Sequence, residues 1–209
     1  MIFHRSGILR KQRGFSLIEM IIVLAIIGFV VAGTNIAIFQ VIRGSSSSSN
    51  HMTAVRQVQN AGYWISRDAQ MAQDLAPSLS PNGFPLTLSW TDRNGYDHQV
   101  VYSLVETSGG LSELQRHHTC AALSLDANST VAEFIDPDGT SCYLYKCLIC
   151  GETFASLVDV ETHFASQHAG AELQYENGAL TFTITAKINS PWQDQIETRI
   201  YRVLPRPSS

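Results

Sequence analysis

The chain has 209 residues, with 14 Lys and Arg against 18 Asp and Glu, and its formal net charge is −4 at pH 7. This length allows one domain, or one domain with an appendage. Four basic residues and no acid lie in the first 14 residues, so the remainder holds 10 basic and 18 acidic residues and a charge of −8. Such an acidic remainder is a poor general binder of nucleic acids or anionic lipid surfaces.

The N-terminal segment is a short basic leader followed by a long apolar run. The leader ends at Gly14, and the run extends from Phe15 to about Gln40. Its one charged residue is Glu19, five residues after the glycine. A carboxylate within hydrocarbon costs about 2.5 to 3.5 kcal/mol on insertion scales, so we expect Glu19 to be there for a partner.

This pattern resembles the class III signal of type IV prepilins and of the pseudopilins of type II secretion: basic residues, then Gly, Phe, Ser, Leu, Ile and Glu, here residues 14–19. The resemblance implies that a membrane prepilin peptidase cuts between Gly14 and Phe15 and methylates the new amino terminus. It also implies that inner-membrane assembly machinery joins the chain to other pilins or pseudopilins. In that assembly Glu19 would neutralise the amino group of Phe15 on a neighbouring subunit.

Two simpler interpretations of this segment are an ordinary secretory signal and a plain single-pass anchor. Residues 31–33, Val-Ala-Gly, are a weak match to a signal-peptidase site of small residues. Neither interpretation explains the presence of Glu19 or a basic leader that ends at Gly14.

Residues 15–40 are apolar on nearly all sides, as a transmembrane helix must be. The basic leader predicts a cytoplasmic N-terminus and an extracytoplasmic globular domain. Residues 45–49 are all serine, which by composition indicates a flexible linker, whereas the resemblance to pilins implies that the helix continues. We expect one helix over residues 15–76, locally weakened at the serines and ended by Pro77. After the serines, small and apolar residues recur at helical spacing: Val55, Val58, Gly62, Ile65, Ala69 and Ala72.

Beyond Pro85 the apolar periodicity changes from helical to alternating, which favours strands. An antiparallel sheet of about six strands, packed on the long helix, is therefore expected, and the fold class is α+β. Its globular β-domain would comprise residues 77–144 and 171–209. The expected strands are 86–90, 99–105, 111–116, a hairpin of 173–175 with 179–186 around a turn at 176–178, and 198–204.

Residues 145–170 form an insert that resembles a C2H2 zinc finger. Cys147 and Cys150 are followed after twelve residues by His163 and His168. Two thiolates on a tight hairpin and two imidazoles one turn apart on a helix can complete a tetrahedron around Zn²⁺. Four protein ligands leave no open position, so the resemblance implies a structural ββα unit that folds only with its metal.

Other states of the cysteines and histidines remain open at this point. In an exported domain Cys147 and Cys150 could instead form a disulfide, although both finger histidines would then have no role. Cys120 and Cys142 are a possible disulfide between two neighbouring strands, and four cysteines allow three full pairings. The adjacent histidines at 117–118 suggest either a second metal site or exposed positions on a strand.

The charge of the insert argues against DNA binding. Between Cys147 and His168 there are three acids and no Lys or Arg, and two thiolates would cancel the charge of Zn²⁺. Affinity for DNA depends largely on neutralising phosphates, so nucleic acid is not expected as a partner. Apolar residues offer a surface for a protein partner or for the sheet instead: Leu148, Ile149, Leu157 and Phe164.

No nucleophile elbow, phosphate loop or His-Glu-x-x-His helix occurs in the sequence, so no enzymatic activity is expected. The resemblance implies a minor pilin or pseudopilin, a structural subunit of a type IV pilus or of a type II secretion pseudopilus. Two alternatives are a membrane-tethered, zinc-stabilised binding or adhesion module that does not polymerise, and a component of a DNA-uptake pilus.

Overall fold

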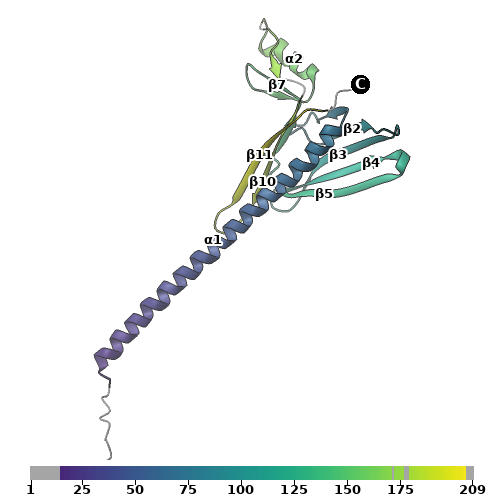
Figure 1. Ribbon diagram of the computed structural model, residues 1–209. Helices are drawn as coiled ribbons and strands as arrows, with labels where there is room; N and C mark the ends of the chain where they lie inside the picture. The colour runs from purple at the N-terminus through teal and green to yellow at the C-terminus, as the bar shows by residue number, and fades with distance from the viewer. Residues whose placement is uncertain (1–14, 171, 177–178, 206–209) are drawn as a thin grey trace, which may run out of the picture. The chain divides into compact units, whose positions relative to one another are not determined.

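The computed structural model describes residues 15–170, 172–176 and 179–205. The chain divides between Ser46 and Ser47 into two compact units. Its secondary structure is one long helix, an eight-stranded antiparallel sheet and a small insert with a helix and three short strands. The expected α+β class, with a long apolar N-terminal helix and an antiparallel sheet, is confirmed (Figure 1).

The long helix α1 spans Leu17–Met71 and is unbroken through the five serines (Figure 1). At its start, the backbone carbonyl of Ser16 accepts hydrogen bonds from the N–H groups of Glu19 and Met20, at 3.0 and 3.2 Å. Serine is only a moderately poor helix former, so five in a row weaken a helix without ending it. The continuous helix that we expected is therefore what the chain forms.

The end of α1 differs from the expectation, because the helix stops at Met71 and not at residue 76. Asp74–Ala76 form a short strand, β1, which pairs antiparallel with β2, Leu86–Thr91. Proline disfavours helical geometry in the residue before it, and Pro77 follows β1 directly. The extended backbone before Pro77 is thus used to add an edge strand to the sheet.

The sheet has the order β1-β2-β3-β4-β5-β10-β11, with β6 also paired to β10. The strands from β2 to β5 form a meander in which a short 3₁₀ helix, Ala121–Leu123, joins β4 to β5. Strands β1, β5 and β6 were not predicted. In β5 all of residues 126–130 are exposed, and the strand lacks an alternating apolar pattern. The remaining bounds are β3 Asp97–Glu106, β4 Ser112–Cys120, β5 Leu125–Ile135, β6 Ser141–Tyr143, β10 Leu180–Ile188 and β11 Gln195–Val203.

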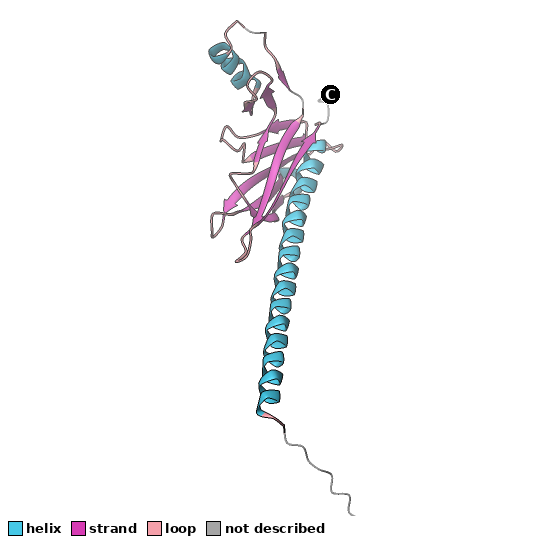
Figure 2. Ribbon diagram, turned by 90° about the vertical axis from the view of Figure 1, so that its left-hand side faces the viewer, coloured by secondary structure: helices cyan, strands magenta, loops and turns pink. Residues whose placement is uncertain are grey.

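The main core lies between the second half of α1 and one face of the sheet (Figure 2). The helix contributes Ala54, Val58, Ala61, Ile65 and Ala69, and Ala72 directly after it is also fully buried, so the predicted helical face is the packed face except that Val55 is half-buried. The sheet contributes large apolar side chains such as Leu86, Tyr102, Leu114 and Phe182.

The insert is built from β7, Tyr145–Cys147, β8, Thr153–Phe154, and the helix α2, Leu157–Gln167. A third strand, β9, Tyr175–Glu176, pairs with β7 and gives the order β8-β7-β9. The predicted hairpin of 173–175 with 179–186 is therefore wrong, and the insert extends to residue 176 and not to 170. Alternation in the sequence indicates a strand but does not identify its partner, and here β9 pairs with β7 as the third strand of the small sheet.

Candidate functional site

The two cysteines of the insert lie on a tight turn after β7. The Cys147 N–H donates to the Glu152 carbonyl at 2.8 Å, and the Gly151 N–H donates to the Cys147 carbonyl at 3.0 Å. Gly151 has φ +80°, a left-handed conformation that favours glycine. This turn brings the Sγ atoms of Cys147 and Cys150 to the same side of the insert as α2.

The two histidines come from the C-terminal half of α2. His163 lies within the helix, and His168 is its C-cap, with its N–H donating to the Phe164 carbonyl at 3.0 Å. At the other end Ser156 is the N-cap, and its Oγ accepts from the Asp159 N–H at 3.3 Å. Val160 and Phe164 pack with Cys147 in a small core, which fixes the helix against the cysteine turn.

The ligand atoms of Cys147, Cys150, His163 and His168 all lie within 4.8 Å of one another. The closest recorded approach is 3.2 Å, between Cys150 Sγ and His163 Nε2. Among the described residues, no other group of three or more Cys, His, Asp or Glu side chains has this geometry. The four residues predicted from their spacing are thus brought together, and they could hold a metal ion.

Two hydrogen-bonding details fit a cation at this point. Among the described residues, His168 Nε2 is the only buried side-chain nitrogen or oxygen that has no hydrogen-bond partner. A buried polar atom without a partner costs about 1 to 3 kcal/mol of folding free energy. The other ring nitrogen of His163, Nδ1, lies 3.1 Å from Glu152 Oε2. A carboxylate in that position orients a ligating imidazole and increases its basicity.

The thiol chemistry of Cys147 also suits a cation. Burial disfavours its thiolate, but hydrogen bonds from the backbone N–H groups of Cys150, Ile149 and Gly151 and from the Cys150 side chain outweigh burial, so the pKa of the Cys147 thiol is lowered. A lowered pKa increases the thiolate fraction, which is the form that binds a metal.

The other two cysteines are free thiols in this structure, not a disulfide. The possibility left open by the sequence, a bridge between neighbouring strands, does not fit the strand order. Cys120 ends β4, whose partners are β3 and β5, whereas Cys142 lies on β6, which pairs with β10. The Cys142 Sγ donates to the Gly83 carbonyl at 3.1 Å.

The adjacent histidines of β4 do not form a joint metal site. His117 is exposed, and its Nε2 lies 2.6 Å from Asp126 Oδ1. His118 points to the opposite face of the strand, where its Nε2 lies 3.1 Å from His98 Nδ1 and its ring packs against Trp90. Burial, together with Arg116 and His98, lowers the pKa of His118. Of the two interpretations, a second metal site and histidines on a strand, the second fits His117 and His118.

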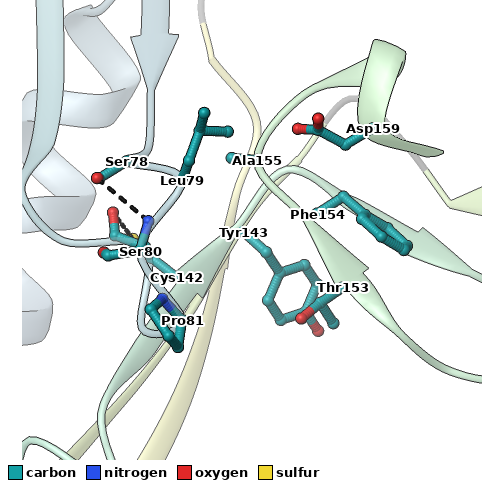
Figure 3. A pocket seen from close by; sticks show the side chains of 11 residues that line it. Ser78, Leu79, Ser80, Pro81, Cys142, Tyr143, Thr153, Phe154, Ala155 and Asp159 are labelled. Carbon is teal, nitrogen blue, oxygen red and sulfur yellow. Dashed lines mark hydrogen bonds between the residues drawn. The ribbon is translucent and has the colours of Figure 1, made fainter. Parts of the chain in front are cut away.

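A pocket of about 320 Å³ lies between the loop at residues 78–83 and the insert (Figure 3). Its wall on the insert side includes Thr153, Phe154 and Asp159. Its polar groups serve local structure, since Ser78 Oγ accepts from the Ser80 N–H at 3.3 Å and the Asp159 carboxylate accepts from Ser156 Oγ at 2.6 Å. No charged groups converge there, so the metal-ligand cluster is the better candidate site.

The N-terminal segment is the second functional region. Gly14 lies outside the described residues, Phe15 precedes α1 and is exposed, and Glu19 is the acidic residue of the first helical turn. An 18-residue window of α1 has a mean hydropathy of 2.6 and none of it is buried within the protein. By length and composition, α1 can cross a membrane.

A family model described as the prokaryotic N-terminal methylation motif matches residues 9–35. We found no match to this chain among curated proteins or solved structures. A protein with a long apolar N-terminal helix, an antiparallel sheet and this motif has the features of a membrane-anchored pilin-like protein. The motif supports a type IV pilin-like or pseudopilin subunit, as the resemblance at residues 14–19 predicted.

The motif further implies a structural subunit and not an enzyme. It implies processing by a prepilin peptidase and assembly with other pilins in a membrane. The metal-ligand cluster lies far along the sequence from this motif and is not part of the matched region.

Proposed function

We propose that this chain is a minor pilin or pseudopilin of a type IV pilus or type II secretion pseudopilus, cut between Gly14 and Phe15 and assembled through α1. The observation that carries this proposal is the methylation motif at residues 9–35. The N-terminus would be cytoplasmic before processing, and the β-domain with its insert would be extracytoplasmic.

Glu19 is the residue that we assign to assembly. It lies four residues after Phe15, one helical turn away, in a span that has no other charge up to residue 40. After cleavage the new amino group at Phe15 would carry the opposite charge. In apolar surroundings two such charges attract far more strongly than in water, so a neighbouring subunit would be held in register by this pair.

The test is the substitution Glu19→Ala, with Glu19→Asp as the charge-retaining variant and Glu161→Ala, on the exposed part of α2, as the control. We expect Glu19→Ala to be exported and cut like the wild type but to be lost from filaments isolated with the other pilins. Glu19→Asp should recover part of this incorporation, and Glu161→Ala all of it. Incorporation of Glu19→Ala at the wild-type level would contradict the proposed role. Absence of even the wild type from filaments would favour a tethered module that does not polymerise.

We further propose that Cys147, Cys150, His163 and His168 hold one structural Zn²⁺. The choice of zinc is supported by the two-sulfur, two-nitrogen donor set, which suits its tetrahedral coordination. Bound metal would cross-link the cysteine turn to α2. Among the described residues, the insert core contains only three buried side chains, Cys147, Val160 and Phe164, so the metal would supply much of the stability of this unit.

A further inference from the structure

The C-terminal strand β11 is an edge of the sheet. Among the described strands it pairs only with β10, over all nine residues from Gln195 to Val203. An edge strand has a row of backbone N–H and C=O groups that another strand can pair with. Proteins usually protect such an edge with proline, charged inward-facing residues or a bulge. Strand β11 contains no proline and no recorded bulge, and the two charged residues on its one face, Glu197 and Arg199, have opposite signs.

The two faces of β11 differ in what they contact. Tyr201, on one face, donates from its Oη to the Val58 carbonyl of α1 at 3.1 Å, so the odd-numbered residues face the helix. The even-numbered residues face the other way, which Figure 2 shows as a sheet face without a helix over it. On that face Ile196 is 56% exposed and Ile200 is 72% exposed.

The sequence of this strand is complementary to itself when read in the antiparallel direction about Thr198. In that register Ile196 lies opposite Ile200, and Glu197 lies opposite Arg199. The same register continues beyond the central five residues, where Asp194 lies opposite Arg202 and Trp192 opposite Leu204. Each acid thus meets a base, and the isoleucines and Trp192 meet apolar residues, whereas Tyr201 and Val203 lie opposite glutamines.

We propose that β11 is a self-association site, at which two copies of this chain pair antiparallel, edge to edge, about Thr198. The pairing would extend the sheet across a two-fold axis, and such an isologous contact requires a self-complementary surface. The two Ile196–Ile200 pairs would cover the exposed apolar side chains on one face. The two Glu197–Arg199 pairs between the chains would form on the other face. They would replace the ion pair within each chain, in which Arg199 Nε lies 3.1 Å from Glu197 Oε1. This interface is distinct from assembly through α1.

The charge pattern permits a sharp test with the full chain in detergent. Glu197→Arg would place arginine opposite arginine in both halves of the interface, and Arg199→Glu would place acid opposite acid. Each variant alone should weaken self-association at least about tenfold, because like charges directly opposite are unfavourable. An equimolar mixture of the two variants should restore it, since every pair across the mixed interface is then again of opposite charge.

The measurements are sedimentation of each protein and co-capture of two differently tagged copies, with Glu106→Arg, at the exposed end of β3, as the control. Association that persists in both single variants, or a mixture that fails to recover it, would overturn the proposal, as would a wild-type chain that stays monomeric. Recovery in the mixture also shows that both variants are folded. Association of the membrane helices would not respond to either charge reversal, so it is distinguishable from pairing at β11.

Discussion

Asp68 of α1 and Arg116 of β4 form a buried ion pair, with 2.7 Å between Asp68 Oδ2 and Arg116 Nε. The Asp68 side chain is 1% exposed, and its Oδ2 also accepts from the Tyr102 hydroxyl at 2.6 Å. Burial, and next the negative charge of Asp68, raise the pKa of Tyr102 well above its ordinary value, so this hydroxyl remains a donor. Arg116 in turn lies over the ring of Trp64, 5.2 Å from its centroid. One carboxylate therefore connects the helix to two strands.

Replacing this carboxylate should destabilise the β-domain strongly. Asp68→Asn leaves Arg116 partly buried without a counter-charge, and removing one partner of a buried pair costs about 3 kcal/mol or more. Urea unfolding of the purified protein measures this loss. Asp138→Asn, on an exposed loop, is the control and should change the free energy of unfolding by less than about 0.5 kcal/mol. Equal stability of the two variants would show that the ion pair does not hold α1 to the sheet.

Gly62 of α1 packs directly against Tyr201 of β11. A Cβ at this position would overlap the Tyr201 ring, which is stacked on Phe182 with 5.0 Å between the ring centroids. Gly62→Ala should therefore cost about 1 to 3 kcal/mol of stability through overpacking. In the background of Tyr201→Ala the same change should cost little, because the obstructing ring is gone.

The control for that prediction is Gly44→Ala in the same helix. A Cβ at Gly44 has nothing within 4 Å, so alanine should be neutral or slightly stabilising through its higher helix propensity. Thermal unfolding of the four variants measures the coupling. Additive effects of Gly62→Ala and Tyr201→Ala would mean that the ring can move aside at no cost.

Metal content provides the test of the proposed zinc site. The purified chain should contain about one zinc ion, and Cys147→Ser should reduce this to near zero, because a three-ligand site binds zinc far more weakly. Cys120→Ser, which removes a buried cysteine outside the cluster, should keep the ion. Since the insert core and the main core are separate clusters, chelation should unfold the insert and leave the cooperative unfolding of the β-domain in place. Full zinc content in Cys147→Ser would exclude the site.

The reactivity of Cys142 tests the account of the remaining cysteines. Burial raises the pKa of this thiol to about 12, above its ordinary value of 9.0. A neutral buried thiol favours the folded state below about pH 9, and this contribution is lost as the pH rises through the folded-state pKa. At pH 8 iodoacetamide should therefore spare Cys142 in the folded chain and modify the exposed Cys150 after removal of metal. Peptide mapping that finds Cys142 alkylated, or joined to Cys120, would contradict the structure.

The sequence predicted best the features that depend on local pattern. The span after Gly14, the packed face of α1 and the four ligands of the insert each follow a fixed residue spacing, and the structure has the helix, its packed face and the ligand cluster where that spacing placed them. The methylation motif was recognised from six consecutive residues, 14–19.

The features that were missed depend on contacts between residues distant in the sequence. Asp68 is a polar residue on an apolar helical face, and only the position of Arg116, 48 residues later, explains it. Residues 173–175 were predicted as the hairpin partner of the strand that is now β10, but β9 pairs with β7 of the insert. The sequence likewise left a Cys120–Cys142 pair open, and the strand order places these two residues on strands that are not neighbours.

The central claim, that the chain is a processed pilin-type subunit, is tested most directly by the intact mass and N-terminal sequence of the protein from its native cell envelope. We predict a mature chain that begins at a methylated Phe15, and a Gly14→Val variant that keeps its leader because the bulkier residue blocks cleavage. A native chain that still begins at Met1 would contradict the claim.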